Sequence, residues 1–529
     1  MAENNASGTA PERSRRWVLI ILVVAAALYA AGINSHWRFQ RDSAVYMDLA
    51  RSMLERRGYV SNYEPHTKYT PGFPLMLAAC GAVSGVPETL SDSFLCFNLL
   101  ESLLGLGCIA LFYLVLRELA LPRAVEMAAF LFFAFSRTLY YYSTHVMTDV
   151  PFTFFALGAL WLGLKMVKEA AWRSWAAGAG AAIMILVASS IRPVGPLLVV
   201  AVTAGLWLRR GALRRWKGNL GKTVLLVSLL AASLLAYSIW MHSAGSEEGS
   251  GGAYFRNKVA AHRFARLATV LVTEFGKHME GISDVLLGTQ VGTAAGAILT
   301  LVMLVGLAQS LKRGERQLSV FAALVIGVIL AGGWALRRRY LLPAAPVMYL
   351  WLALGGATIG SWLGRRWKFW TPRRTRRLGY VLICLVLAVN VMRIGKVIYQ
   401  NRWPDFYAQT ADGRLSDYGE ICAWLRDNAD REDAVLAYES STVHYFSRVR
   451  TVHLPCDTRG KKAAWLEQLI DRRKARFVVL DRRKPESTAV AQKAIEQHPE
   501  AFRQVLKPGK TKLLRVSPAG LSPGGVPKE

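Results

Sequence analysis

The chain has 529 residues, of which 53% are hydrophobic, and its formal net charge is +29. Its apolar residues fall in runs of about 17–25, the length that crosses roughly 30 Å of hydrocarbon, and this excludes an ordinary soluble protein. The basic residues lie in short clusters between the runs, where the positive-inside rule places them, so the charge does not indicate nucleic-acid binding.

The apolar runs predict a polytopic α-helical membrane protein with about 11 transmembrane helices. They lie near residues 17–34, 93–116, 124–142, 150–167, 175–191, 194–208, 222–240, 289–311, 318–336, 340–363 and 378–398. With this number of spans, the basic segments all fall on one side of the membrane, namely 1–16, 117–123, 165–173, 209–222, 312–316 and 364–377. That side is predicted to be cytoplasmic. The first run lacks a cleavage motif and is predicted to be an uncleaved span.

The other side carries the longer polar segments. Two outer loops, 35–92 and 242–288, interrupt a transmembrane domain that covers residues 17–398. In the second loop, 254–280 has the pattern of a basic amphipathic helix on the membrane surface, or of a solvated loop helix. Helix-like and strand-like runs alternate over 399–517, which predicts a small external α/β domain with a partly parallel sheet. Residues 518–529 have the composition of a disordered tail.

The six cysteines do not form an obvious disulfide framework. Those in or beside apolar runs are typical of small core residues, namely Cys80, Cys96, Cys108 and Cys384. Cys422 and Cys456 lie in the polar tail and could pair, although spacing alone does not decide this.

Two acids stand at the outward ends of apolar runs. Asp42 follows the first run and begins an amphipathic helical pattern, and Asp149 precedes the fourth run. The simplest interpretation of each is a helix N-cap, which the helix dipole favours. Two carboxylates on the same outer face also suit a group transfer, in which a base takes the proton of the acceptor.

Arginines lie on the same outward side, against the positive-inside trend. They are Arg192 and the run Arg337, Arg338 and Arg339, which Tyr340 follows. Planar guanidinium groups recognise phosphate through paired donors, although arginines at an interface can also simply extend their charge into water. Since adjacent side chains of a helical turn point in different directions, one or two of the three are expected to face a site.

Four motifs occur in order along the membrane part. They are Asp-x3-Tyr-x3-Ala-x2-Met-Leu from Asp42, Tyr-x-Pro-Gly-x-Pro-Leu from Tyr69, Met-Thr-Asp-x-Pro-Phe around Asp149, and Arg-Tyr-x2-Pro-x2-Pro from Arg339. This order resembles the GT-C superfamily of glycosyltransferases, in particular the protein O-mannosyltransferases and the lipid A aminoarabinose transferases. The resemblance covers residues 17–398.

The resemblance implies roles for residues in these motifs. Asp42 would be the catalytic acid or base, and Asp149 would be a second acidic position. The residues implied for the donor phosphate are Arg337, Arg338, Arg339, Tyr340, Lys68 and Arg192. The residues implied for lining the substrate site are Tyr46, Tyr69 and His145.

The sequence departs from the family pattern at two positions. Ser43 stands where many relatives have Glu, and Thr70 stands where several have Lys, with Lys68 two residues earlier. Members of the superfamily differ in their use of a divalent metal, and no His/acid cluster in this sequence indicates one. The metal is therefore left unknown, and no other cofactor is indicated.

The resulting hypothesis is a membrane glycosyltransferase. It would move a sugar, with inversion, from a polyprenyl-phosphate-linked donor to a protein, lipid or polysaccharide acceptor at the outer face of a bacterial-type plasma membrane. The alternative is a transporter or flippase of a polyprenyl-linked or other amphiphile, which would need ionisable residues within its spans. The apolar runs contain few acids, chiefly Glu101 and Glu126, so the transferase is preferred. No feature supports a scaffold protein.

Overall fold

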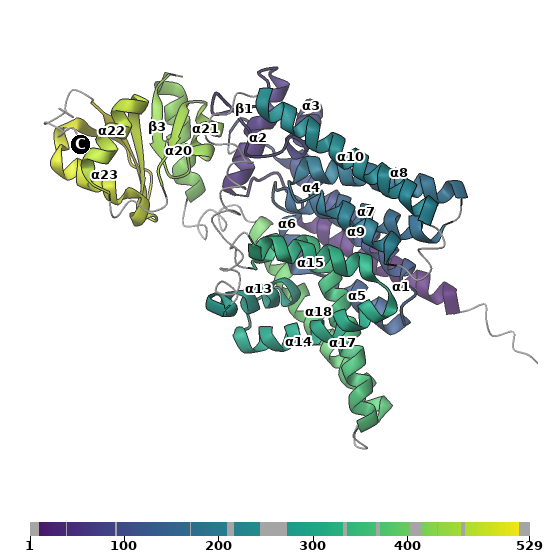
Figure 1. Cartoon of the computed structure of the whole chain (residues 1–529). Helices are drawn as coiled ribbons and strands as arrows, with labels where there is room; N and C mark the ends of the chain where they lie inside the picture. The colour runs from purple at the N-terminus through teal and green to yellow at the C-terminus, as the bar shows by residue number, and fades with distance from the viewer. Residues whose placement is uncertain are drawn as a thin grey trace, which may run out of the picture. The chain divides into compact units, whose positions relative to one another are not determined.

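The computed structural model divides the chain into two compact units. It describes residues 10–208, 216–243, 272–331, 336–366, 371–402, 414–455 and 461–517, apart from 39, 90, 91, 170 and 431. The helical unit comprises Met1–Ile33, His66–Phe73 and Phe97–Tyr399, and the mixed unit comprises Asn34–Pro65, Pro74–Cys96 and Gln400–Glu529. Figure 1 shows the helices and strands in chain order.

The helical unit is built from the apolar runs of the sequence. Its helices are α1 (Ala10–Gly32), α4 (Leu95–Glu118), α5 (Arg123–Ala134), α6 (Arg137–Tyr142), α7 (Asp149–Lys168), α8 (Ala171–Ile191), α9 (Leu197–Trp207), α10 (Trp216–Ser243), α13 (Phe275–Leu287), α14 (Thr293–Arg313), α15 (Arg316–Ala331), α16 (Arg338–Leu341), α17 (Ala345–Arg366) and α18 (Pro372–Arg402). Within the described residues, six helices are long and apolar enough to cross a membrane, and five further apolar helices are shorter. The chain is therefore a multi-pass membrane protein.

Two predicted spans differ from single helices, and both differences place functional side chains. The run 124–142 breaks after α5, because the Ser136 side chain accepts a hydrogen bond from the Leu139 N–H and begins α6. The run 340–363 begins with the short helix α16 and the 3₁₀ turn η2 (Leu342–Ala344), and α17 follows. Arg137 thus begins α6, and the arginine run surrounds the start of α16.

The mixed unit contains a five-stranded sheet in the order β4-β3-β5-β7-β6. The strands are β3 (Ala434–Ala437), β4 (Arg450–His453), β5 (Ala475–Asp481), β6 (Phe502–Leu506) and β7 (Thr511–Val516). β3 pairs in parallel with β4 and β5, and β7 pairs antiparallel with β5 and β6. The strand-like runs of the sequence coincide with β3, β5 and β7, and the short strands β4 and β6 extend the sheet.

Helices cover both faces of this sheet, as Figure 1 shows. On one face, α22 (Ala463–Arg473) and α23 (Pro485–Gln497) share an apolar core with the strands that includes Leu466, Val490 and Val478. On the other face, Trp424 of α20 (Arg414–Asn428) lies edge-on to Phe477 at 5.7 Å between ring centroids. Because both faces are covered, every residue of β3 is buried.

The first outer segment belongs to the same mixed unit as this sheet. It contains α2 (Arg41–Leu54), the two-stranded ribbon β1 (Val60–Ser61) and β2 (Glu64–Pro65), and most of α3 (Gly72–Ser84). Asn62, in the turn of the ribbon, donates to the Thr451 carbonyl of β4 at 2.7 Å and accepts from the Thr451 N–H at 2.8 Å. These two hydrogen bonds between the Asn62 side chain and the backbone of Thr451 fix the ribbon against the edge of the sheet.

A disulfide corrects the interpretation of two cysteines. Cys80 of α3 and Cys96 of α4 are joined, with 6.3 Å between their Cα atoms. They are therefore not the small core residues that the sequence predicted. The pair was not predicted because both cysteines lie in or beside apolar runs. Cys108, Cys384 and Cys422 are free, and Cys108 and Cys422 are buried.

Several predicted features lie outside the described residues. They are Cys456, the tail 518–529, the basic loop 209–215 and most of the predicted surface helix at 254–280.

Candidate functional site

Asp149, at the start of α7, holds two arginines from distant parts of the helical unit. Arg192 Nη2 donates to Asp149 Oδ1 at 2.7 Å, and Arg339 Nε donates to Oδ2 at 3.2 Å. Arg192 Nε also donates to the Thr148 hydroxyl at 3.1 Å. Both carboxylate oxygens are therefore occupied by guanidinium groups, which fixes the orientation of the two cations.

Local sequence explains how these three residues meet. Pro193 disfavours helical geometry for the residue before it, so α8 ends at Ile191 and Arg192 stands just beyond the helix. Arg339 is held in the single turn of α16, next to Tyr340. Thr148 is the N-cap residue of α7, which makes Asp149 its first helical residue and corrects the N-cap interpretation of Asp149.

The Asp149 side chain and its two arginine partners differ in solvent exposure. The Asp149 side chain is 0% exposed, whereas the side chains of Arg192 and Arg339 are 15% and 25% exposed. A buried carboxylate with both oxygens engaged is suited to positioning arginines rather than to taking a proton from a hydroxyl. The accessible chemistry of this part of the site is a pair of fixed guanidinium groups.

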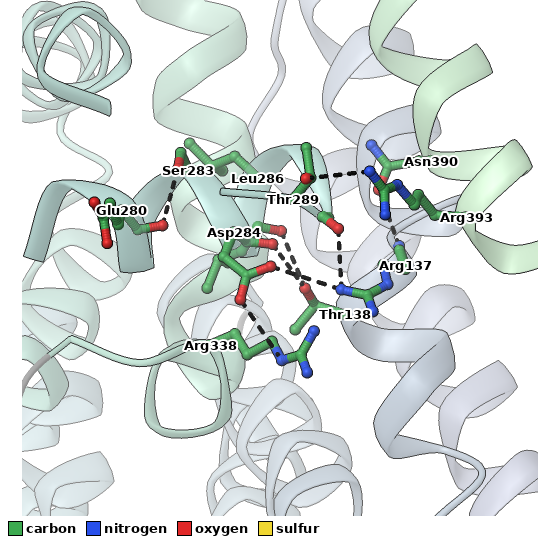
Figure 2. Close-up of polar contacts among 12 residues, drawn as sticks. Arg137, Thr138, Glu280, Ser283, Asp284, Leu286, Thr289, Arg338, Asn390 and Arg393 are labelled. Carbon is green, nitrogen blue, oxygen red and sulfur yellow. Dashed lines mark hydrogen bonds and ion pairs between the residues drawn. The ribbon is translucent and has the colours of Figure 1, made fainter. Parts of the chain in front are cut away.

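A second acid, Asp284 of α13, lies between two further arginines (Figure 2). Arg137 Nη1 and Arg338 Nε each approach one of its carboxylate oxygens at 3.6 Å. Arg137 also donates to the Gly288 carbonyl at 3.0 Å, and its backbone N–H donates to Asn390 Oδ1 at 3.0 Å. Contacts from Arg137 and Arg338 thus connect α6, α13, α16 and α18. We call Asp284 and the arginines around it the Asp284 cluster.

Aromatic side chains adjoin these arginines. The Arg338 guanidinium lies 4.7 Å from the centroid of the Tyr141 ring, and it interacts electrostatically with Tyr142. The ring of His145 lies 4.2 Å from that of Tyr141, and His145 is buried. The cation–π contact with Tyr141 helps to fix Arg338 without adding negative charge.

Lys68 and Tyr69 lie in a short segment of the helical unit, His66–Phe73. Lys68 is exposed, and its Nζ lies 5.2 Å from the centroid of the Tyr69 ring. At Gly72 a Cβ atom would lie 2.3 Å from the Ser190 hydroxyl oxygen, so only glycine permits this close approach to the end of α8. The segment therefore packs beside the helix end that Arg192 follows.

The remaining predicted residues have different surroundings. Arg337 is exposed and is the N-cap residue of α16, so of the three consecutive arginines only Arg338 and Arg339 contact an acid among the described residues. Asp42 is half-buried in the first turn of α2, whose N-cap residue is Gln40, and this corrects the N-cap interpretation of Asp42. Tyr46 is buried on the same helix. Asp42 and Tyr46 belong to the mixed unit, whereas the arginines belong to the helical unit.

Comparison with known proteins identifies the fold. The family model described as dolichyl-phosphate-mannose-protein mannosyltransferase matches residues 71–240. The structure is similar to that of ArnT from Cupriavidus metallidurans in the apo state, with a TM-score of 0.56 and 12% identity over 97% of this chain and 100% of that one. The form of ArnT bound to undecaprenyl phosphate gives a TM-score of 0.54 and 12% identity over 97% and 99% of the two chains.

A third similar structure is the archaeal oligosaccharyltransferase AglB from Archaeoglobus fulgidus, in complex with an inhibitory peptide and a dolichol-phosphate. It gives a TM-score of 0.55 and 12% identity, over 95% of this chain and 74% of that chain. No curated protein sequence matches the chain. The chain has the GT-C glycosyltransferase fold.

The fold expected from the motif resemblance is thus confirmed. The family match contains Asp149 and Arg192 but neither Asp42 nor the arginine run. Within the described residues, no group of three or more His, Cys, Asp or Glu side chains is arranged to hold a metal ion.

Sequence reasoning missed three residues of this site. Asp284 and Arg137 gave no motif signal, because these two partners lie 147 residues apart in the sequence. Glu101, on α4, was noted only as an acid within a span. Its Oε1 accepts the Met147 N–H at 3.1 Å, which fixes the turn before Asp149. The sequence signal that could have identified Glu101 as part of the site was the presence of an acid inside an apolar span.

Proposed function

We propose that this chain transfers a sugar from a polyprenyl-phosphate carrier to an acceptor at the outer face of the plasma membrane. The observation that carries the proposal is the pair of partly exposed guanidinium groups held by Asp149. Two similar GT-C structures are described as bound to undecaprenyl phosphate or dolichol-phosphate, so lipid phosphates are ligands of this fold.

Charge at the Asp149 site fits such a donor. Two guanidinium groups and one carboxylate leave one positive charge, and the phosphodiester of a polyprenyl-phosphate sugar carries one negative charge. When the bond between sugar and phosphate breaks, its electron pair moves to the leaving phosphate and adds negative charge there. Fixed cations in a partly dehydrated site stabilise this charge more than mobile ones would.

The acceptor side of the reaction needs a base. The oxygen or nitrogen of the acceptor attacks the anomeric carbon from the face opposite the phosphate, which inverts that centre, and loses its proton. We assign Asp42 as the base that takes this proton, because it is the half-buried acid at the start of α2 and matches the acidic position of the family motif. Asp149 is assigned as a positioning residue for Arg192 and Arg339.

Sidedness follows from two independent features. Every dense basic segment falls on one side of the predicted spans, which the positive-inside rule makes cytoplasmic. The Cys80–Cys96 disulfide joins the first predicted outer segment to the beginning of the apolar run that follows it, and disulfides persist in oxidising compartments. Both features support an outward position for Asp42 and the arginines.

The test is a comparison of cells that carry the wild-type chain, Arg339→Ala or Arg337→Ala, or that lack the protein. Mass spectrometry of envelope lipids, glycans and proteins should reveal a sugar-bearing product with wild-type and Arg337→Ala. Arg339→Ala should lose the product and accumulate the carrier-linked sugar. Arg339→Lys should restore only part of the product, because lysine keeps the positive charge but lacks the paired N–H donors of a guanidinium group. Identical product profiles with and without the protein would refute the proposal.

A further inference from the structure

The Asp284 cluster carries more positive charge than its acid balances. Arg137 and Arg338 approach Asp284 at 3.6 Å, and a third arginine, Arg393 of α18, donates to the neutral Thr289 hydroxyl at 3.4 Å (Figure 2). Arg338 and Arg393 are both close enough to Arg137 to interact with it electrostatically, so these three guanidinium groups and the one carboxylate leave an excess of two positive charges. Part of this charge is shielded from water, since Arg137 and Arg338 are only 17% and 26% exposed. Such an arrangement favours an anionic ligand.

The donors of this cluster are also incompletely used. Contacts at 3.6 Å exceed hydrogen-bond distance, so the carboxylate of Asp284 attracts the guanidinium groups without saturating their N–H donors. Arg137 Nε is buried and has no hydrogen-bond partner within the described structure. Asp149 differs, because its partners lie at 2.7 and 3.2 Å. The Asp284 cluster therefore retains more capacity to bind the oxygens of a ligand.

The cluster adjoins the proposed donor site. Arg338 and Arg339 are neighbours in α16, yet the first contacts Asp284 and the second contacts Asp149. Tyr142 interacts electrostatically with Arg338, Arg339 and Asp149. Two anions held by these two acid–arginine groups would thus be next to each other.

We propose that Arg137, Arg338 and Arg393 form a second oxyanion subsite, which binds a phosphate group beside the carrier phosphate. An excess of two positive charges matches a phosphate monoester, which carries nearly two negative charges at neutral pH. The second phosphate belongs either to the carrier, as the terminal group of a diphosphate, or to a separate molecule such as the acceptor. The inference rests on the proposed function, because the first subsite is the one assigned to the donor.

The experiment is a titration of the purified full-length chain, followed by native mass spectrometry. The probes are polyprenyl monophosphate, polyprenyl diphosphate, and inorganic phosphate added to the monophosphate complex. If the carrier supplies the second phosphate, the diphosphate should bind at least about tenfold more tightly than the monophosphate, the effect of one or two charge-assisted hydrogen bonds. If a separate molecule supplies it, the monophosphate complex should retain one equivalent of inorganic phosphate.

Variants connect the result to the cluster. Arg338→Ala should reduce the diphosphate preference, or the binding of the extra phosphate, about tenfold. Arg393→Ala should act in the same direction, and since Arg393 is exposed and bonds only a hydroxyl among its described contacts, this change should leave folding intact. Arg337→Ala is the matched control, because it removes an exposed arginine from the same segment. The proposal is overturned if wild-type protein shows neither effect, or if both arginine variants leave the effect unchanged.

Failure of this inference can be told apart from failure of the proposed function. Binding of the monophosphate should depend on Arg339, which belongs to the first subsite. If Arg339→Ala does not weaken monophosphate binding, the donor assignment fails, whatever the diphosphate result. If it does weaken binding, and both Arg338→Ala and Arg393→Ala leave binding of the second phosphate unaffected, only the second subsite fails.

Discussion

The two acids of the helical unit hold their arginines differently. Asp149 accepts true hydrogen bonds from Arg192 and Arg339, and its side chain is fully buried. Asp284 attracts its arginines from 3.6 Å and remains 14% exposed. Since a buried carboxylate that loses its charge leaves its cations uncompensated, the Asp149 site is the more sensitive of the two to mutation.

Asp149→Asn tests the positioning role. The amide keeps the shape but removes the charge that holds Arg192 and Arg339 together, so both guanidinium groups should leave the donor phosphate position. We expect kcat/KM for the carrier lipid to fall about 100-fold, the effect of misplacing a binding group by about 1 Å. The measurement is a kinetic series with purified donor, with Arg337→Ala as the control. A positioning role requires the pH profile of the residual activity to keep its wild-type shape; loss of its acid limb would instead make Asp149 the base.

Asp42→Asn tests the base. An amide cannot take the proton of the acceptor, so turnover should fall on the order of 10²–10⁴-fold. Binding of the carrier lipid should stay close to that of the wild type, since no phosphate contact is assigned to Asp42. Turnover is measured with purified donor lipid, and the elution profile in gel filtration checks that the variant is folded. Near-normal turnover would leave Asp42 as an acid that merely favours the first turn of α2 through the helix dipole.

Helix α2 is held in the mixed unit by buried polar contacts with α21 (Ser440–Ser447). Asp48 Oδ2 lies 3.3 Å from His444 Nε2, and both side chains are at least 95% buried. Arg51 donates to the Tyr445 carbonyl at 2.7 Å and stacks on the Tyr445 ring. Asp42 lies in the first turn of the same helix. The C-terminal α/β part therefore helps to fix the helix that carries the assigned base.

The acidity of Asp48 gives this contact a pH dependence. Burial by itself would raise the pKa of Asp48, but His444 and hydrogen bonds from Ser61 and the Asn62 N–H outweigh it and lower the pKa from 3.8 to about 2. Because the folded-state pKa is lower than the unfolded one, Asp48 stabilises the fold above about pH 4, and this stabilisation disappears as the pH falls toward 2.

Asp48→Asn should remove that dependence. We expect the variant to lose about 2 kcal/mol at pH 7 and to approach the wild type as the pH falls from 5 to 3. The measurement is thermal unfolding of the mixed unit within the full chain, followed by tryptophan fluorescence at pH 7, 5, 4 and 3. Other carboxylates titrate equally in both proteins, so the difference between them reports on Asp48. A difference that does not change with pH would contradict the assigned ion pair.

Length and hydropathy were sufficient to predict most of the membrane part. The helices α4, α7, α8 and α14 begin within four residues of the predicted apolar runs, because spanning the hydrocarbon requires a fixed length of apolar helix. The motifs contain Asp149 and Arg339, and Arg192 was singled out as an arginine on the outward side. Their mutual contacts could not be read from the sequence, since α7, α8 and α16 meet only through helix packing.

What escaped prediction depends on contacts between distant residues. Asp284 meets Arg137 across 147 positions of the sequence, and no local pattern marks either of them. The break at Ser136 inside a continuous apolar run depends on a single side-chain hydrogen bond to Leu139. The Cys80–Cys96 pair was hidden because each cysteine lies in or beside an apolar stretch.

Orientation in the membrane is the property of the whole chain on which the site assignment depends. The dense basic segments predict a cytoplasmic N-terminus, and an odd number of spans then places the chain after α18 outside. A reporter enzyme that needs disulfides to fold should therefore be active when fused after Arg402 and inactive when fused after Arg313, at the end of α14. A fluorescent reporter that functions only in the cytoplasm should show the opposite result at both positions. Reversed outcomes would place Asp42 and the arginine clusters inside the cell, where an outer-face transfer could not occur.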